Sequence, residues 1–466
     1  MQLLQRLGKT FFNVEPHERV KTLFLGITFF FIIFSYTIIK ELKDSVFMGI
    51  MGTKNYVPAA KLLTIIALIP LVFLYSKLVD SVRRYQLLCV CAGIYSVVGL
   101  LCAYLVGDSS IGLSNQAVGA NRLFGWIFYF FVESFNPFVL SVFWAFLNSV
   151  SSPQSAKENY GLVISCSKIG GMLSAGLGWL FLSYNHVLNG WGFSDIALIQ
   201  FLLILSALSL LMVPVTIYAM IKRVPGAYMH GYEAAYQFEK HHKNTKEDTT
   251  LWSGLSLLLK HPYTFGIFAL VLFFEIVSSI LSFQRLGVAE DCGIGIAKTS
   301  CFLLGLSFAV HCVGFFISFL GTRIIVSRLG ERLSLVLIPL IIGVVLVYYT
   351  FTTSAAALLV CFVVMRAVHY ALNQPITEAL YIPTVKAVKF KSKSWIDTFG
   401  KKMAKGVGSV FNGIASSFGP ALFQSIHASL FACVIGMWVA VAYLLGKKFE
   451  TAVKNQEVIG ATDTDN

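Results

Sequence analysis

Long apolar stretches follow one another along almost the entire chain, and mostly short polar connections separate them. Each stretch has about twenty residues, which as an α-helix cross the ~30 Å hydrocarbon core of a membrane. The strands of an outer-membrane barrel would instead alternate apolar and polar residues over about ten positions. The pattern therefore predicts an all-α, polytopic membrane protein with twelve transmembrane helices. The predicted spans are residues 22–44, 57–76, 85–106, 121–147, 160–182, 196–221, 262–284, 298–322, 333–352, 355–380, 400–421 and 425–446.

The composition supports this class and excludes an ordinary soluble protein. Of the 466 residues, 56% are hydrophobic and 13% are charged, whereas a soluble domain has about 25% charged residues. The nine cysteines lie almost all inside apolar runs, which is typical of buried hydrophobic residues and indicates neither a disulfide framework nor a metal site. No cofactor and no metal are expected. The N-terminus lacks the short apolar core and cleavage site of a signal peptide, so the first helix is expected to stay as an anchor.

The formal net charge of +13 is explained by where the lysines and arginines lie, so nucleic acid is not an expected partner. They concentrate at the N-terminus, in the second, sixth, eighth and tenth connections, and in the tail. The third, fifth, ninth and eleventh connections contain only Arg122. Because cytoplasmic segments of membrane proteins are rich in Lys and Arg, both termini are predicted to be cytoplasmic. We expect a monomeric, multi-pass protein of the cytoplasmic (inner) membrane.

The longest connection mixes both signs of charge and divides the spans into two sets of six. It predicts an N-terminal six-helix half (1–221), a cytoplasmic linker (222–261), a C-terminal six-helix half (262–446) and a cytoplasmic tail (447–466). The His241–His242 pair in the linker is interpreted as part of a solvated loop rather than as a metal site.

The two predicted halves resemble each other. A basic turn follows the second helix of each half, DSVRRYQ (80–86) and SRLGER (327–332). The fifth helix of each half contains a stripe of small residues, which lets helices approach closely. The stripes are Gly170, Ser174 and Gly178 in one half and Ser409, Gly413 and Ser417 in the other. These repeats favour a major-facilitator-like transporter built from two six-helix halves.

Charged residues interrupt the first apolar span at the sequence YTIIKELKD (36–44). Lys43 and Asp44 come three and four residues after Lys40. At this spacing the three side chains share one face of a helix. A charge at the centre of a bilayer costs at least ~2.5 kcal/mol, so this face is predicted to line a water-filled pathway. The alternative is that these side chains only extend to the membrane interface.

Three further charged residues, Glu133, Glu275 and Arg366, lie inside predicted spans. Glu133 lies in FYFFVESFNPF and Glu275 in ALVLFFEIVSSI, and His369 and Asn373 follow Arg366 at helical spacing. Charges inside a membrane predict functional sites. The alternative at each position is an interhelical salt bridge or a buried hydrogen bond that stabilises the bundle.

A lysine-rich stretch, residues 379–406, leads into the eleventh predicted span. It contains no glycine-rich turn that ends in Gly-Lys-Ser/Thr, so nucleotide hydrolysis is not implied. Lys393 and Asp397 are four residues apart just before this span and Lys405 enters it, which fits a helix at the mouth of a pathway. A substrate with several phosphates would need such lysines, together with those of the first span, to offset its desolvation. The alternative is a cytoplasmic loop that binds lipid headgroups or fixes the topology.

Two of these motifs resemble the ATP/ADP translocase (nucleotide transporter) family of plastids and obligate intracellular bacteria. YTIIKELKD (36–44) is similar to the first-helix sequence YTILRDxKD of that family. LYIPTVKAVKFKSKSWID (380–397) follows LYIPTxxxxKxKxKxxID almost residue for residue. The order and spacing of the spans also agree, so the resemblance covers nearly the whole chain.

The resemblance implies that Lys43, Lys393, Glu133 and Glu275 are important for transport. One departure is Ser134–Phe135, which stands where a tryptophan often follows the fourth-helix glutamate of the family. Because family members differ in substrate, this departure bears on the substrate more than on the family.

The expected function is therefore a membrane transporter that exchanges nucleotides, ATP for ADP foremost, across the cytoplasmic membrane by alternating access. Proton-coupled net import, NAD/ADP exchange and exchange of other organic anions stay open, and a membrane receptor or scaffold is the alternative of another class. An intramembrane enzyme is not expected, because the sequence has neither a His-Glu-x-x-His pair nor a nucleophile with a base. The predicted substrate-binding residues are Lys43, Glu133, Glu275, Lys393, Lys40, Arg366, Asp397 and Lys405.

Overall fold

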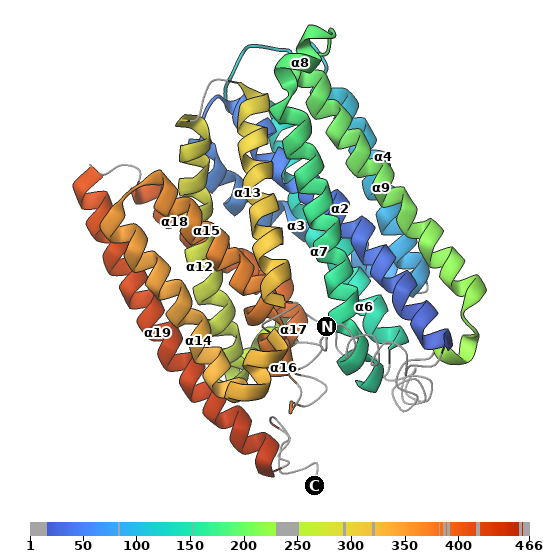
Figure 1. The fold of residues 1–466 in the computed structure, drawn as a ribbon, viewed down its shortest axis with the longest axis vertical. Helices are drawn as coiled ribbons and strands as arrows, with labels where there is room; N and C mark the ends of the chain where they lie inside the picture. Colours follow the sequence, from blue (N-terminus) through green and yellow to red (C-terminus); the bar gives the residue numbers. More distant parts are fainter. Residues whose placement is uncertain are drawn as a thin grey trace, which may run out of the picture. The chain divides into compact units, whose positions relative to one another are not determined.

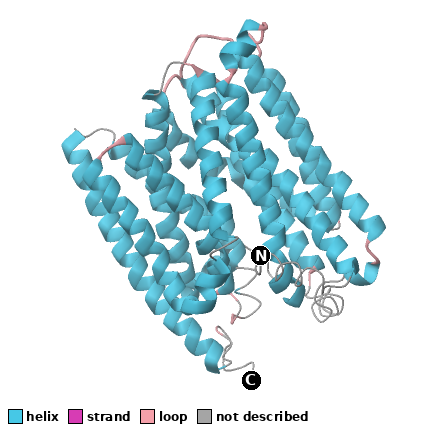
Figure 2. Ribbon diagram, viewed as in Figure 1, coloured by secondary structure: helices cyan, strands magenta, loops and turns pink. Residues whose placement is uncertain are grey.

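Helices make up almost all of the protein that the structure describes (Figures 1 and 2). The computed structural model describes residues 16–82, 84–151, 153–229, 251–291, 295–318, 322–381, 383–384, 388, 392–415, 420–455 and 459. Over these ranges no strand is found, and eleven helical segments are long and apolar enough to cross a membrane. The predicted all-α membrane class is confirmed.

Some predictions fall outside the described residues. These include the His241–His242 pair, most of the linker and Ser417 of the second small-residue stripe. Three lysines of the lysine-rich stretch are also outside: Lys386, Lys389 and Lys391.

Eleven of the twelve predicted spans coincide with the helices that can cross a membrane. The span predicted over 400–421 corresponds to α18 (Lys401–Ala415), whose 15 residues are followed by 416–419, outside the described part. Several helices extend beyond their predicted ends, above all α2 (Pro16–Met51) and α19 (Pro420–Asn455). Hydropathy finds the apolar middle of a helix, whereas its backbone hydrogen bonds continue into the polar ends.

The contacts divide the chain into two compact units. Unit 1 comprises Met1–Ile50, Pro70–Ala117 and Arg122–Lys246, and unit 2 comprises Met51–Ile69, Val118–Asn121 and Glu247–Asn466. Helix α3 (Val57–Ser81) therefore contributes its first part to unit 2 and its second part to unit 1. The change falls at Pro70, which has no amide N–H to continue the helical hydrogen-bond ladder.

Unit 1 is a bundle in which α4 makes its most extensive contact with α9. On α7, a Cβ added at Gly170 would lie 2.6 Å from the Phe30 carbonyl oxygen of α2, so the backbones of α7 and α2 approach closely there. This confirms the first small-residue stripe at Gly170. The main helices of unit 1, besides α2 and part of α3, are α4 (Arg84–Val106), α5 (Leu123–Phe135), α6 (Ser141–Val150), α7 (Pro153–Ser183), α8 (Asn185–Gly190) and α9 (Asp195–Arg223).

Unit 2 is organised around α12, which packs against α15, α18 and α19. Phe274 of α12 and Trp438 of α19 are fully buried in its core. The short helix η1 is tied to the end of α12, because Lys54 Nζ lies 2.8 Å from Glu290 Oε2. The helices of unit 2 include η1 (Lys54–Tyr56), α11 (Leu251–Lys260), α12 (Pro262–Asp291), α13 (Ile296–Phe316), α14 (Thr322–Thr352), α15 (Ala355–Val368), α16 (Gln374–Ala379), α17 (Lys393–Trp395), α18 and α19.

The second small-residue stripe is only partly used for packing. On α18, Ser409 is fully buried, and a Cβ added at Gly408 would lie 2.8 Å from Ser279 Cβ of α12. Among the described residues, nothing lies within 4 Å of a Cβ added at Gly413, so a close approach of helices is seen at Gly408 and not at Gly413. Residues four apart are rotated by about 40° around a helix, and the stripe therefore turns away from the contact.

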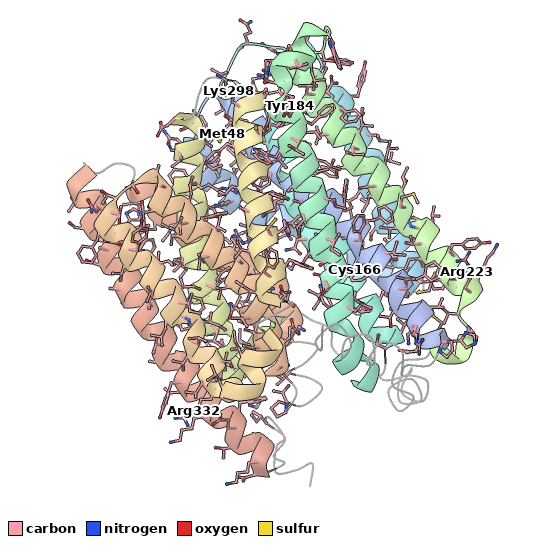
Figure 3. All side chains as sticks on the ribbon, in the orientation of Figure 1. Met48, Cys166, Tyr184, Arg223, Lys298 and Arg332 are labelled. Atoms are coloured by element: carbon pink, nitrogen blue, oxygen red, sulfur yellow. The ribbon has the colours of Figure 1, made fainter. Side chains whose placement is uncertain are left out.

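The basic turn predicted at 327–332 is a kink inside α14. Gly330 has φ 74° and ψ 172°, a left-handed conformation that residues with a Cβ adopt only with strain. Arg332, labelled in Figure 3, follows it with a nitrogen 3.8 Å from Glu450 Oε2 and its guanidinium 4.2 Å from the ring centre of Tyr443. The kink thus directs Arg332 onto α19.

Three π-helical segments have bounds that lie wholly within the described residues: η2 (Asn136–Leu140), η5 (His369–Asn373) and η7 (Ile396–Gly400). A π-turn inserts an extra residue and is frequent at functional sites. Each segment begins three residues after a charged residue of the predicted site, namely Glu133, Arg366 and Lys393.

Candidate functional site

In unit 1 the fold brings Lys43 of α2 and Glu133 of α5 together. Lys43 Nζ donates a 2.6 Å hydrogen bond to Glu133 Oε1 and also lies 3.2 Å from Asp44 Oδ1. The Lys43 side chain is only 5% exposed. An unpaired charge buried to this degree would be strongly destabilising, so the carboxylates are what makes the position tolerable.

An aromatic ring completes the surroundings of Lys43. Its Nζ lies 4.2 Å from the ring centre of Tyr129, a fully buried residue of α5. Tyr129 is four residues before Glu133, so both side chains emerge from one face of the helix. Sequence reasoning missed this tyrosine, although its spacing from Glu133 was a usable signal.

Lys40 lies at the edge of this group rather than inside it. Its Nζ is 3.2 Å from Glu41 Oε1, and its side chain is 28% exposed. Lys40 thus pairs with Glu41, its neighbour in sequence, and Asp44 pairs with Lys43. Because it is more exposed, Lys40 depends less on a carboxylate partner than Lys43 does.

In unit 2, Glu275 of α12 and Lys405 of α18 face each other at a longer distance. Lys405 Nζ lies 3.9 Å from Glu275 Oε2, which is an ion pair but too long for a hydrogen bond. The Glu275 side chain is 8% exposed, and within the described chain its Oε2 has no hydrogen-bond partner. A buried oxygen in this state costs about 1–3 kcal/mol. This oxygen can therefore accept a hydrogen bond from a substrate group.

Ser279, one turn beyond Glu275, links three segments of unit 2. Its hydroxyl donates to the Lys405 carbonyl oxygen at 3.1 Å and accepts a 3.2 Å hydrogen bond from Lys61 Nζ. Asn412 Nδ2 donates to the Ser279 carbonyl oxygen at 3.3 Å. These bonds hold α12, α18 and the start of α3 in register around Glu275.

Lys393 forms its ion pair with Glu378 at the end of α16 and not with Asp397. Its Nζ also lies 5.3 Å from the ring centre of Tyr381. Asp397 instead pairs with Lys401, with an N–O distance of 2.7 Å. Sequence reasoning missed Glu378, although it is a carboxylate two residues before the LYIPT motif in a largely apolar segment.

The stripe that begins at Arg366 divides into separate contacts. An Arg366 guanidinium nitrogen lies 3.4 Å from Ser282 Oγ, and the group faces the ring of Phe362 at 5.6 Å. Asn373 Nδ2 and His369 Nδ1 form their own 3.0 Å hydrogen bond. Arg366 therefore contacts α12, and so does His369, whose ring stacks on that of Phe274 with the ring centres 3.7 Å apart.

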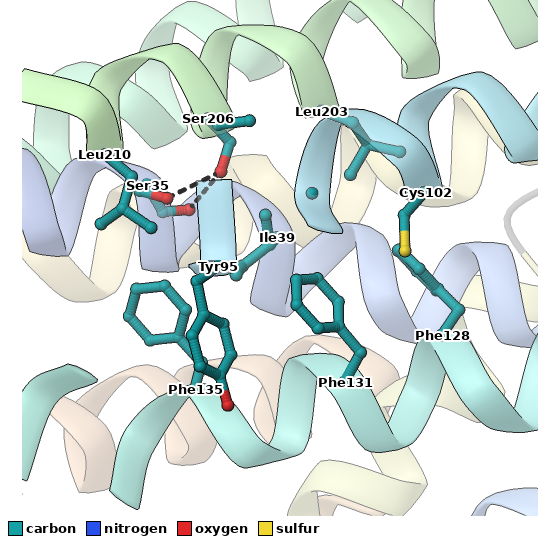
Figure 4. Close-up of a pocket in the computed structure, with 12 residues that line it drawn as sticks. Ser35, Ile39, Tyr95, Cys102, Phe128, Phe131, Phe135, Leu203, Ser206 and Leu210 are labelled. Carbon is teal, nitrogen blue, oxygen red and sulfur yellow. Dashed lines mark hydrogen bonds between the residues drawn. The ribbon is translucent and has the colours of Figure 1, made fainter. Parts of the chain in front are cut away.

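A small pocket in unit 1 lies between α2, α4, α5 and α9 (Figure 4). Its walls include Tyr95, Phe131 and Phe135, and Ser35 and Ser206 hydrogen-bond to each other at 2.9 Å. The cavity volume is about 10 Å³, room for about one water molecule. It is too small for a nucleotide base and is a gap in the packing rather than a substrate site.

The predicted residues thus fall into two groups that share one chemistry. Lys40, Lys43 and Glu133 lie in unit 1, and the other five lie in unit 2. In both groups, lysine ammonium groups are held next to carboxylates along apolar helices. Among the described residues no group of His, Cys, Asp and Glu could hold a metal ion. The arrangement suits the binding of an anion by lysines.

Solved structures with a similar fold are membrane transporters. The D-xylose-proton symporter matches with a TM-score of 0.59 at 13% identity, covering 92% of this chain and 97% of that chain. The nucleoside transporter NupG matches with a TM-score of 0.56 at 12% identity, covering 92% and 99%. The chain therefore shares the fold of these transporters, and the predicted fold class is confirmed.

The chain belongs to the TLC ATP/ADP transporter family, whose model matches residues 2–109 and 116–360. It is 24% identical to ADP,ATP carrier protein 1 of Chlamydia trachomatis over 98% of this chain and 94% of the relative. It is 22% identical to ADP,ATP carrier protein 4 of Rickettsia conorii over 95% of this chain and 94% of the relative. The predicted family is confirmed.

Proposed function

We propose that this protein exchanges nucleotides, ATP for ADP foremost, across a membrane by alternating access. The observation that carries the proposal is the Lys43–Glu133 ion pair, which lies buried between two membrane-spanning helices. Charges in such positions mark substrate pathways. The relatives that carry the name ADP,ATP carrier support the same substrate class.

The lysines bind the phosphates of the nucleotide in this proposal. Lys43 pairs with Glu133, and Lys393 pairs with Glu378. A phosphate oxygen is also an anionic acceptor, so it can take the place of a carboxylate oxygen at an ammonium group. We assign the phosphate contacts to Lys43 and Lys393, and charge balance during binding to Glu133 and Glu275. The surrounding charges that adjust this balance are Lys40, Arg366, Asp397 and Lys405.

Exchange removes most of the electrical work of moving a negatively charged nucleotide across the membrane. Three negative charges that enter against 100 mV, inside negative, are opposed by about 7 kcal/mol, at ~2.3 kcal/mol per charge. An outgoing nucleotide of similar charge cancels most of this term. Exchange of one nucleotide for another therefore needs no additional ion.

Proton-coupled net import is the second candidate, and Glu275 is the observation that favours it. Its buried Oε2 has no hydrogen-bond partner in the described part of the chain. Carboxylates inside a membrane form the proton relays of transporters, and this oxygen is the position that a co-transported proton would occupy. Glu133 is less suited to this role because its Oε1 already accepts a 2.6 Å hydrogen bond from Lys43.

Reconstituted vesicles distinguish the two functions. Labelled ATP is offered to proteoliposomes that are empty or loaded with ADP, with and without a protonophore. Exchange requires internal ADP and is unaffected by the protonophore. Uptake into empty vesicles that collapses with the protonophore would establish the second candidate instead. Competition by unlabelled GTP, UTP and NAD then defines the substrate, and absence of nucleotide uptake under every condition would refute both.

The organisation proposed for the transporter follows the charge pattern. Its parts are an N-terminal half (1–221), a cytoplasmic linker (222–261), a C-terminal half (262–446) and a cytoplasmic tail (447–466). We place the protein as a monomer in the cytoplasmic membrane with both termini inside. No enzymatic activity and no nucleic-acid partner are proposed.

A further inference from the structure

Lys43 is held by two groups of different chemistry that come from one helix. Glu133 of α5 accepts its hydrogen bond at 2.6 Å, and the Tyr129 ring lies 4.2 Å from its Nζ. The two side chains lie one turn apart, so the ammonium group rests between a carboxylate and the face of a ring. A cation within about 6 Å of a ring centre is attracted by the negative face of the ring.

Lys393 in unit 2 has the same two kinds of neighbour. Glu378 accepts its hydrogen bond, and the Tyr381 ring centre lies 5.3 Å from its Nζ. Glu378 lies in the last turn of α16, and Tyr381 follows three residues later in the turn after that helix. The lysines come from α2 and α17, segments that are unrelated in local sequence. The same Lys–Glu–Tyr combination is therefore found in both units among the described residues.

The carboxylate and the ring respond differently to an incoming phosphate. A carboxylate is an anion like the phosphate and competes with it for the ammonium group. A ring has no formal charge, and both rings are packed in place, Tyr129 fully and Tyr381 94% buried, with 0% and 6% exposure. The ring can therefore stay under the lysine when the carboxylate is displaced.

We infer that Tyr129 and Tyr381 are positioning residues that hold Lys43 and Lys393 ready for phosphate. By the same geometry, Glu378 is the partner in unit 2 that corresponds to Glu133, whereas Glu275 belongs to a different cluster. The inference rests on the proposed nucleotide exchange and adds residues to it. The rings keep each ammonium group in position whether the carboxylate or a phosphate occupies its other side.

The first test separates the ring face from the hydroxyl group and from packing. ATP/ADP exchange is measured in proteoliposomes with Tyr129→Phe, Tyr129→Leu and, as a control, Phe128→Leu. Phe128 is a buried ring on the same helix. Tyr129→Phe should leave KM within about twofold, whereas Tyr129→Leu should raise KM by roughly 30-fold with a small change in kcat, because binding is weakened. Phe128→Leu should change KM little.

The same comparison at Tyr381 should give a smaller effect. Lys393 is 27% exposed and Lys43 is 5% exposed, and cation–π attraction weakens in contact with water. Tyr381→Leu should therefore raise KM by about fivefold, and Tyr381→Phe should restore it. The inference is overturned if Phe is as damaging as Leu at both positions, or if Phe128→Leu raises KM as much as Tyr129→Leu.

A graded replacement covers the case in which a leucine variant does not fold. Fluorinated phenylalanines at position 129 keep the shape of the ring and progressively weaken its negative face. KM should rise with each added fluorine. A KM that stays the same across the series would show that the ring contributes packing alone, and would overturn the assignment of Tyr129.

The role of Glu378 has its own matched control. Glu290 also pairs with a lysine, Lys54, but it belongs to the end of α12, and its side chain is 30% exposed compared with 48% for Glu378. Glu378→Gln should alter the KM for ATP at least threefold, because the ammonium group of Lys393 loses its competing anion, whereas Glu290→Gln should leave KM unchanged. Equal effects of both variants would overturn the assignment of Glu378.

Failure of the inference can be told apart from failure of the proposed function. If the unmodified protein exchanges ATP for ADP but the ring variants behave as packing controls, only the inference falls. If the unmodified protein transports no nucleotide, the proposed function falls and the phosphate role of both tyrosines falls with it. A double-mutant cycle of Lys43→Gln and Tyr129→Leu on the free energy of unfolding would then show whether the ring–lysine contact is energetically real.

Discussion

The Lys43–Glu133 pair allows a quantitative test of how charge is held inside this bundle. Glu133→Gln removes the acceptor at 2.6 Å but leaves Asp44 at 3.2 Å from the ammonium group. Its expected cost is therefore that of one hydrogen bond to a charged group, about 2 kcal/mol in the free energy of unfolding. Lys43→Gln leaves two carboxylates without their shared cation, and its expected cost is about 3–5 kcal/mol.

The double variant shows whether the two residues act on each other. When both charges are removed, neither is left buried alone, so the cost should fall short of the sum of the single variants by about 1.5–3 kcal/mol. The free energy of unfolding is measured by denaturant titration of the purified protein in detergent. Lys40→Gln is the matched control, because Lys40 lies on the same helix with its side chain 28% exposed. It should cost less than about 1 kcal/mol.

Transport by the same variants tests the functional assignment. Lys43→Gln should lower kcat/KM for ATP exchange by about 10- to 100-fold, because a charged hydrogen bond to phosphate contributes roughly 1.5–3 kcal/mol. The reasoning is refuted if the coupling energy between Lys43 and Glu133 is below about 0.5 kcal/mol, or if Lys40→Gln is as damaging as Lys43→Gln. Normal transport by Lys43→Gln would show that the pair only stabilises the bundle.

Three further outcomes are expected. Gly330→Ala should destabilise the protein by about 1–2 kcal/mol, because alanine is strained at φ 74°. Gly436→Ala is the control and should not destabilise it, because an added Cβ there meets nothing within 4 Å. Equal denaturation midpoints of the two variants would contradict this expectation. Reporter fusions at Asn115 and Asn189 should both report a periplasmic position, and inactive alkaline phosphatase at both sites would overturn the topology. Glu275→Gln should impair transport while leaving membrane insertion and stability nearly unchanged, since its Oε2 makes no hydrogen bond in the described chain. Uptake is measured together with the amount of protein in the membrane. If Glu275 is structural, the amount of inserted protein should fall while transport per inserted molecule stays normal.

The sequence by itself determined the class of the protein, its helices and its family. Apolar runs long enough to cross a membrane specify helices, because backbone hydrogen bonds must be satisfied within each segment where no water is present. The YTIIKELKD and LYIPT motifs led to the family, and their lysines and the two glutamates lie at charged clusters of the structure. Helix ends were less predictable, since polar residues continue α2 and α19 beyond the apolar stretch.

The tertiary structure alone decided which charge partners which. Lys393 could pair by helical spacing with Asp397, but it contacts Glu378, which is 15 residues away in sequence. Lys43 meets Glu133 across 90 residues. Such partners depend on how the helices pack and on where π-turns shift the side chains, and neither of these produces a periodic pattern in the sequence. The same reason explains why Tyr129 and Tyr381, ordinary aromatic residues in apolar segments, gained a proposed role only when their rings were found beneath the two lysines.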